Sequence, residues 1–142
     1  MKKRKEGVRK GFTMVELMAV LIILGLLATL VGTKVLKQIE KAKFATTKAN
    51  LKTLHTAVMQ FYMDTQQFPT EEEGLEILVE PGEIEGSDPE GYLEQTEIPK
   101  DGWKNEFIYE PFPEGGGSFA IRSCGPDGEE GTEDDLLSTD AD

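Results

Sequence analysis

The chain has 142 residues, a net charge of −12 and an aromatic share of 8%. This length fits one domain with an extension, and the small aromatic share indicates a small hydrophobic core. The acidic excess argues against a nucleic acid as a partner, because its phosphates would be repelled. A single cysteine, Cys124, excludes an intramolecular disulfide.

The charges are divided unevenly along the chain. Residues 1–11 hold six Lys or Arg and one Glu, whereas residues 12–33 hold one Glu and no basic residue. Residues 34–63 hold six Lys and one Glu, and residues 64–142 hold 24 Asp or Glu against three basic residues. We therefore expect four parts in this order: a leader, a transmembrane half of a helix, a basic amphipathic half of the same helix, and an acidic head domain.

The segment from Phe12 to Gly32 has Glu16 as its only ionisable side chain. At ~1.5 Å per residue this segment is about 30 Å long, the thickness of a bilayer's hydrocarbon core. A buried core helix is the alternative, but a head this small could hardly cover so long an apolar run on all sides. The six basic residues before the run favour a cytoplasmic N-terminus, although the lysines directly after it partly oppose that orientation.

The start of the chain differs from an ordinary secretory signal, because the apolar run is too long and no small-residue cleavage site follows it. Cleavage before the run, between Gly11 and Phe12, would leave a membrane helix with a free amine and with Glu16 one turn further in. A carboxylate in a spanning helix costs on the order of 2.5–3.5 kcal/mol at mid-bilayer and usually indicates a partner. Glu16 therefore either pairs with a positive charge or lies at the lipid headgroup level.

The helical pattern continues past the apolar run. Apolar residues recur at spacings of three and four as far as Phe61, with lysines on the other face, and no Pro or Gly interrupts residues 33–67. The pattern predicts one helix of roughly fifty residues, its first half in lipid and its second half packed on the head domain.

The head domain shows shorter elements. Thr70 and Glu73 fit the capping box of a short helix, and residues 80–92 are rich in Gly, Pro and acidic residues, which is typical of a loop. Glu106–Glu110 and Ser118–Arg122 are predicted strands joined by a turn. The sequence thus predicts an α+β fold, with the long helix laid on a small antiparallel sheet.

The loop at residues 123–135 combines three glycines with many carboxylates. Asp127, Asp134 and Asp135 supply the hard oxygen ligands that suit Ca²⁺. The EF-hand pattern is not met, because Thr132 stands at the sixth position from Asp127 where that motif has glycine. By composition alone, such a loop is more often a solvated acidic turn than a calcium site.

The stretch "KGFTMVELMAVLIILGLLA", residues 10–28, resembles the class III signal of type IV pilins and type II secretion pseudopilins. In that family, prepilin peptidase cuts after a glycine, and the new N-terminal phenylalanine is methylated. The resemblance implies that the bond between Gly11 and Phe12 is cut and that the Phe12 amine is methylated. It also implies that Glu16 pairs with the N-terminal amine of a neighbouring copy during assembly.

The rest of the chain resembles the major pseudopilins of type II secretion, and the resemblance spans residues 7–138. It is carried by the stretches "QQFPTEEEGLEILVEP", "GYLEQTEIPKDGWKNEFIYE" and "SCGPDGEEGTEDDL". The chain departs from the family at Thr33, where a proline is usual, so Gly32 and Thr33 would have to provide the expected weak point of the helix. Gly102 and Lys104 also replace a Pro and a Gly around Trp103.

The resemblance implies a type IV pilin-like fold with a calcium loop, whose ligands would be Asp127, Asp134, Asp135 and the Cys124 backbone carbonyl. It implies a subunit anchored in the inner membrane that polymerises with its own copies into a periplasmic filament. That filament would act as a piston that drives folded proteins through the outer membrane. The implied partners are minor pseudopilins, an inner-membrane assembly platform and, indirectly, an outer-membrane secretin.

Other classes fit the sequence less well. Cys124 with His55 could form a thiol pair, but no nucleophile signature surrounds either residue, so an enzyme is not expected. A membrane-anchored calcium-binding module that never assembles is an alternative. The closest rival is a type IV pilin or competence pseudopilin, but pilins more often close the head with a disulfide.

Overall fold

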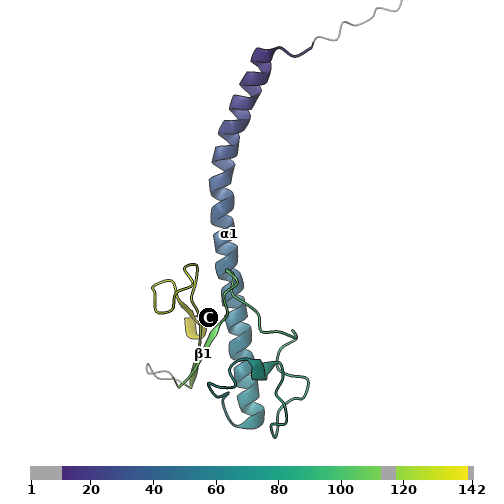
Figure 1. Ribbon diagram of the computed structural model, residues 1–142, viewed down its shortest axis with the longest axis vertical. Coiled ribbons are helices and arrows are strands. Elements are labelled where there is room, and N and C mark those ends of the chain that lie inside the picture. Colours follow the sequence, from purple (N-terminus) through teal and green to yellow (C-terminus); the bar gives the residue numbers. More distant parts are fainter. Residues whose placement is uncertain (1–10, 113–117, 141–142) are drawn as a thin grey trace, which may run out of the picture. The chain divides into compact units, whose positions relative to one another are not determined.

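The structure, a computed structural model, describes residues 11–112 and 118–140. The chain divides into two compact units, residues 1–39 and residues 40–142. Helix α1 (Met14–Thr65) contributes to both units, and the described strands and 3-10 helices all belong to the second (Figure 1). Of the expected leader, only Gly11 lies within the described residues.

Helix α1 is continuous over 52 residues, which confirms the single long helix predicted from the sequence. It passes through Gly32 and Thr33 without a break, and the Thr33 hydroxyl donates a hydrogen bond to the Leu30 carbonyl at 3.3 Å. The helix ends where Gln66 adopts a left-handed φ of 60°, a conformation that commonly closes helices.

The first unit exposes its apolar side chains. An 18-residue window of α1 has a mean hydropathy of 2.6, and none of it is buried within the described chain. Leu21 and Ile22, for example, are 67% and 70% exposed. By length and composition this part of α1 can cross a membrane, and in water its surface would need a cover of lipid or of other protein.

The second unit has one hydrophobic core on the C-terminal half of α1. Leu51, Leu54, Val58 and Phe61 face the head, and all four are fully buried. They recur at helical spacing, which is why one stripe of the helix can cover the sheet. They pack against Ile121 and other buried residues of the head, namely Leu75, Ile77, Leu78, Phe107 and Phe119.

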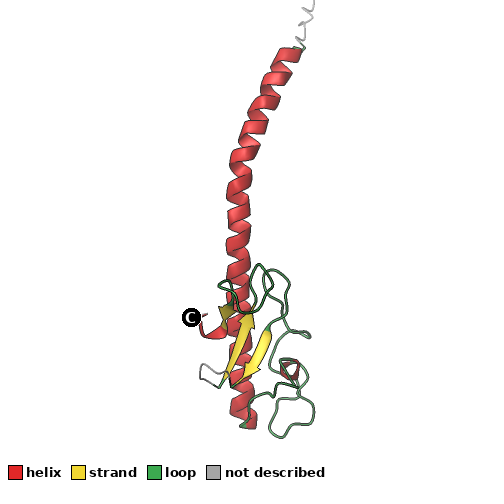
Figure 2. Cartoon of the chain, turned by 60° about the vertical axis from the view of Figure 1, so that its left-hand side comes forward, coloured by secondary structure: helices red, strands yellow, loops and turns green. Residues whose placement is uncertain are grey.

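The sheet has three antiparallel strands in the order β1-β2-β3 and lies beside the C-terminal half of α1 (Figure 2). Strands β1 (Ile108–Pro111) and β2 (Phe119–Ser123) confirm the two predicted strands, each displaced by one or two residues. Most of the predicted turn between them falls in residues 113–117, outside the described residues. Strand β3 (Leu136–Leu137) was not predicted.

The short helix predicted after Thr70 forms differently. The capping box is present, because the Thr70 amide donates to Glu73 at 2.8 Å and the Glu73 amide donates to the Thr70 hydroxyl at 3.3 Å. Gly74 then takes φ 57°, which interrupts an α-helix, and the chain continues as turns and as the 3-10 helix η1 (Glu76–Leu78).

A second 3-10 helix, η2 (Ser138–Asp140), follows β3. Residues 80–92 form the predicted loop.

The turn around Trp103 lies directly against α1. The Gly102 amide donates to the Thr47 hydroxyl at 2.8 Å, and a Cβ at Gly102 would meet the backbone of Lys43. The Trp103 ring makes an edge contact with Phe44 at 4.8 Å between centroids. Lys104 takes a left-handed φ of 72°. This is the position at which glycine is replaced relative to the resembled family.

Lys104→Gly should stabilise the head by about 0.5–1 kcal/mol, because glycine adopts positive φ without a steric cost. Urea unfolding of a fragment of residues 34–142 measures the change. Lys48→Gly is the matched control, because Lys48 is exposed within α1, where the same substitution should cost about 1 kcal/mol. Destabilisation by both substitutions would contradict the left-handed conformation of Lys104.

Candidate functional site

The sequence places its candidate residues in two regions, the start of α1 and the C-terminal loop. At the start of α1, Gly11 and Phe12 precede the helix and are exposed, and nothing would contact a Cβ at Gly11. The bond between them is therefore accessible within the described part of the chain.

Glu16 belongs to a capping box at the start of α1. Its Oε2 accepts hydrogen bonds from the Thr13 amide at 2.8 Å and from the Thr13 hydroxyl at 3.2 Å. In return, the Glu16 amide donates to the Thr13 hydroxyl at 3.2 Å. This arrangement satisfies amides that a helix start leaves unpaired, and a carboxylate is also favoured by the helix dipole there. Sequence reasoning missed this role, although Thr13-x-x-Glu16 is the same pattern that it recognised at Thr70.

The C-terminal loop connects β2 to β3. Its two ends are joined by the sheet, because Ser123 pairs with Leu136. Gly125 takes φ 63°, and a Cβ there would meet the backbone carbonyl of Asp134. The loop therefore returns closely on itself where Gly125 meets Asp134.

The three candidate carboxylates of this loop differ in their surroundings. Asp127 is exposed and accepts a hydrogen bond from the Glu129 amide at 3.0 Å. Asp134 is exposed, whereas the Asp135 side chain is only 11% exposed. Asp135 accepts from the Gly131 amide at 2.9 Å and from the Thr132 hydroxyl at 3.4 Å. Within residues 11–112 and 118–140, no three His, Cys, Asp or Glu side chains are gathered as around a metal ion.

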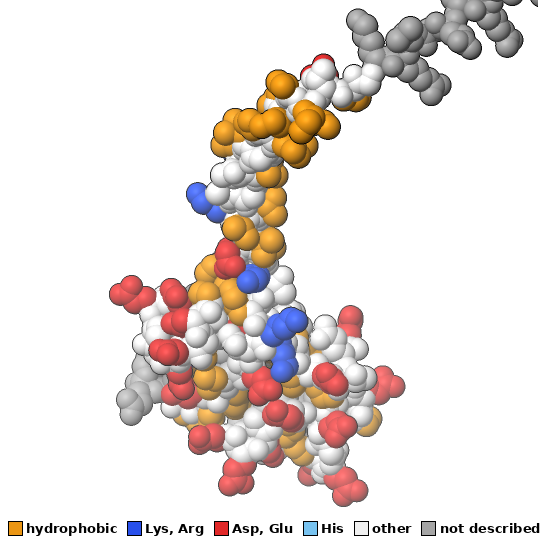
Figure 3. Space-filling model, turned by 45° about the horizontal axis from the view of Figure 1, so that its top comes forward, with side chains coloured by type: hydrophobic (Ala, Val, Ile, Leu, Met, Phe, Trp, Pro, Cys, Tyr) orange, Lys and Arg blue, Asp and Glu red, His pale blue; other side chains and the backbone are white. Residues whose placement is uncertain are grey.

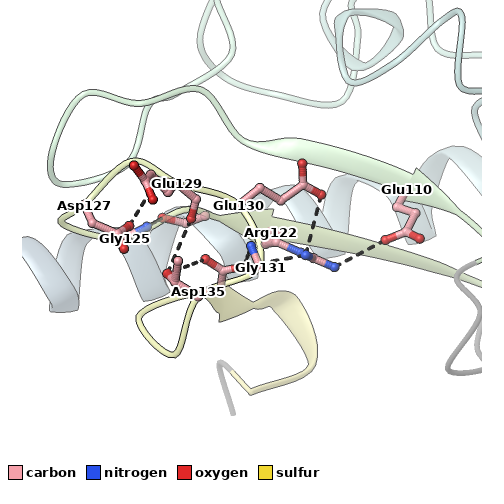
Figure 4. A network of polar contacts seen from close by, with 10 residues as sticks. Glu110, Arg122, Gly125, Asp127, Glu129, Glu130, Gly131 and Asp135 are labelled. Carbon is pink, nitrogen blue, oxygen red and sulfur yellow. Dashed lines mark hydrogen bonds and ion pairs between the residues drawn. The ribbon is translucent and has the colours of Figure 1, made fainter.

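Arg122, on β2, is a further charged residue of this site (Figure 4). Its guanidinium lies 3.5 Å from Asp135, 3.6 Å from Glu130 and 3.5 Å from Glu110. Sequence reasoning did not single out Arg122. The signal was one basic residue directly before a long acidic loop, but that position does not reveal which carboxylates it reaches.

Asp101 is a buried carboxylate that sequence reasoning also missed. It is 4% exposed and accepts hydrogen bonds from the amides of Trp103 and Asn105, at 2.9 Å and 2.8 Å. It also accepts from the Asn105 side chain at 3.2 Å and from the Ser123 hydroxyl at 2.8 Å. Asn105 in turn donates to the Gly125 carbonyl at 3.0 Å. Asp101 thus connects the turn around Trp103 to the start of the C-terminal loop.

The thiol of Cys124 is not prepared for catalysis. Cys124 is buried, and burial raises the pKa of its thiol, an effect to which the nearby Asp135 and Glu130 carboxylates add. The thiol therefore stays protonated at neutral pH, whereas a nucleophilic cysteine needs the thiolate. The other half of the possible thiol pair, His55, packs its ring on Phe119 with 4.8 Å between centroids.

The surface of the two units differs in character (Figure 3). Hydrophobic side chains surround the N-terminal part of α1, and acidic side chains are spread over the head. This agrees with the 24 Asp or Glu among residues 64–142 and with the apolar composition of residues 12–33.

Comparisons with known proteins cover both regions. Residues 34–139 match the family described as type II secretion system (T2SS), protein G, and residues 8–32 match the prokaryotic N-terminal methylation motif. Type II secretion system core protein G of Escherichia coli K12 is 36% identical, over 92% of this chain and 90% of that protein. The Pseudomonas aeruginosa protein of the same name is 34% identical, over 94% of this chain and 93% of that protein.

A solved structure agrees with these matches. The crystal structure of the major pseudopilin from the type 2 secretion system of enterohaemorrhagic Escherichia coli matches with a TM-score of 0.59 and 26% identity. The match covers 72% of this chain and 90% of that one. The resemblance and the type IV pilin-like α+β fold predicted from the sequence are therefore confirmed, and the similarities favour a major pseudopilin over a type IV pilin or competence pseudopilin. The chain belongs to the type II secretion system protein G family.

Proposed function

We propose that this chain is the major structural subunit of a type II secretion pseudopilus, anchored by α1 in the inner membrane and polymerising with its own copies into a periplasmic filament. The observation that carries the proposal is the 18-residue apolar window of α1, of which no part is buried within the described chain. Lipid covers such a surface before assembly, and the α1 helices of neighbouring copies cover it in a filament.

The N-terminus lies in the cytoplasm and the acidic head in the periplasm. Six basic residues before the span support this orientation. The leader, residues 1–11, is removed by prepilin peptidase, and the match of residues 8–32 to the methylation motif supports methylation of the new N-terminus at Phe12.

In the filament, the Glu16 carboxylate pairs with the Phe12 ammonium of a neighbouring copy. A pair buried in this way fixes the register between neighbouring subunits more than it adds to the net stability of the filament. Minor pseudopilins, an inner-membrane assembly platform and, indirectly, an outer-membrane secretin are the partners of such a filament. The chain itself performs no catalysis, and as a piston the filament drives folded proteins through the outer membrane.

Mass spectrometry of the membrane-extracted protein tests the processing step. The expected N-terminus is Phe12 carrying one added methyl group. The exposed position of Gly11 and Phe12 before α1 is the physical reason, since a peptidase needs an extended and accessible bond. An intact Met1, or a cut beyond residue 30, would contradict the pilin-like assignment.

We further propose that the C-terminal loop binds Ca²⁺ through Asp127, Asp134 and the Cys124 backbone carbonyl, with Asp135 as an additional ligand. The donor atoms suit Ca²⁺ in kind, because they are hard oxygens on a loop that Gly125 closes tightly, but no three acidic side chains of the described residues are gathered around one point. The fit is incomplete at Asp135, whose carboxylate is engaged by Arg122 and by the Gly131 amide.

Calcium should raise the melting temperature of a fragment of residues 34–142. An ion that binds the folded state alone stabilises it by RT ln(1 + [L]/Kd), about 2.7 kcal/mol at a hundredfold excess over Kd. Thermal melting with calcium and with a chelator measures the effect, and Asp127→Ala and Asp134→Ala should remove it. Equal melting temperatures in all conditions would mean that the loop is a solvated acidic turn.

A further inference from the structure

The guanidinium of Arg122, at the end of β2, places a positive charge beside the carboxylates of the C-terminal loop. It lies between carboxylates from two directions: Glu110 on β1 contacts one of its nitrogens, while Glu130 and Asp135 of the loop contact another (Figure 4). The Arg122 side chain is 25% exposed and the Asp135 side chain 11%. Their attraction is therefore less screened than that of a surface pair.

Asp135 uses both of its carboxylate oxygens in this arrangement. Oδ2 accepts from the Gly131 amide at 2.9 Å and lies 3.5 Å from Arg122 Nη1, while Oδ1 accepts from the Thr132 hydroxyl at 3.4 Å. Asp127 and Asp134 are exposed, and no contact with Arg122 is found for either among the described residues. Of the three candidate calcium ligands, one, Asp135, is thus held by arginine and the other two are open to solvent.

We propose that Arg122 sets the calcium dependence of this loop by acting as its resident counter-cation. It holds Asp135 and residues 131–135 in place without a metal, and it competes with an incoming ion for the Asp135 carboxylate. The effect of Arg122 on calcium binding deepens the proposed calcium function and rests on it. The effect of Arg122 on the metal-free loop does not depend on that function.

Two consequences follow from the charges. A divalent ion entering the loop meets the positive charge of Arg122, so the affinity of the loop for calcium is lower than its carboxylates alone would give. The metal-free loop, in turn, carries less repulsion among its carboxylates, because Arg122 compensates part of their charge. Arg122 therefore makes the loop less dependent on calcium in both respects.

The test compares three variants of the full chain in detergent micelles. Arg122→Gln removes the positive charge. Arg122→Lys keeps the charge but lacks the planar guanidinium, whose two terminal nitrogens contact different carboxylates. Lys100→Gln is the matched control, because it removes one positive charge from the same head, where Lys100 lies 3.5 Å from the exposed Glu106. Calorimetric titration gives the calcium Kd, and melting with calcium and with a chelator gives the calcium dependence.

Arg122→Gln should lower the calcium Kd by about tenfold or more and enlarge the drop in melting temperature on chelation. Arg122→Lys and Lys100→Gln should stay near the wild type in both measurements. An unchanged or raised Kd in Arg122→Gln would overturn the proposal. An equal effect of Lys100→Gln would overturn it too, because the lower Kd would then follow from the net charge of the head alone.

Hydrogen exchange of the Gly131 amide separates this inference from the calcium proposal. In chelator, this amide should be protected in the wild type and in Lys100→Gln but exchange faster in Arg122→Gln, because Asp135 has lost its anchor. In an Asp135→Asn background, Arg122→Gln should add little. If the wild type binds no calcium, the calcium proposal fails, and this exchange result alone decides whether Arg122 holds the loop. Equal protection in all variants would refute that role.

Discussion

Glu16→Ala should leave the leader cut and α1 inserted in the membrane but abolish filament formation. The proposed cut lies before the helix, and α1 keeps its apolar length, so neither step needs the carboxylate. A carboxylate in the apolar interior of a filament must be neutralised, and the Phe12 ammonium of a neighbouring copy is the proposed partner. Electron microscopy of filaments, with mass spectrometry of the N-terminus, measures both halves of the result.

Glu16→Gln separates the proposed pairing from the observed capping box. Glutamine can accept the hydrogen bond from the Thr13 amide as glutamate does, so the start of α1 should persist. It carries no charge, so it should form no ion pair and build no filaments. If Glu16→Gln assembles normally while Glu16→Ala does not, capping is the role of Glu16 and the proposed pairing is wrong.

Asp101→Ala should destabilise the head by about 3 kcal/mol or more, because it leaves several donors around the buried Asp101 position without an acceptor. Two of these donors are the amides of Trp103 and Asn105, and a third is the Ser123 hydroxyl. The loss should also loosen the C-terminal loop, because Asn105 would no longer be held where it donates to the Gly125 carbonyl. Urea unfolding of a fragment of residues 34–142 measures the change.

Glu106→Ala is the control for Asp101→Ala. Glu106 lies in the same stretch of chain, but its side chain is 85% exposed, and its ion pair among the described residues is with Lys100, at 3.5 Å. Its removal should change stability by about 0.5 kcal/mol or less. Asp101→Asn should fall between the two, because asparagine keeps an acceptor for the amides but turns a donor toward Ser123. Similar losses from Asp101→Ala and Glu106→Ala would show that the buried network contributes little.

The parts of the fold that depend on local pattern could be predicted from the sequence. Helix α1 follows from apolar spacing over a long unbroken segment, and β1 and β2 follow from short runs bounded by turn residues. The capping box at Thr70 was also foreseen, but the α-helix after it was not formed, because Gly74 takes a positive φ. Strand β3 has two residues, which is too short to show an alternating pattern.

The contacts that organise the candidate site join residues far apart in the chain, and no local pattern indicates them. Asp101 accepts from Ser123, and Arg122 reaches both Glu110 and Asp135. These pairs depend on how the sheet brings β1, β2 and the C-terminal loop together. The acidic residues of the loop could be named from the sequence, but their division between arginine and solvent could not.

The close contact of Gly102 with α1 has a mechanical consequence. A Cβ at Gly102 would collide with the backbone of Lys43, so here the turn meets the helix main chain to main chain. The Asn50 side chain adds a hydrogen bond to the Lys100 carbonyl at 2.8 Å on the same face. A load applied along α1 would therefore pass into the head through backbone contacts, which deform less than contacts between long, flexible side chains. In the proposed piston-like filament, such a junction would let the head advance together with its helix.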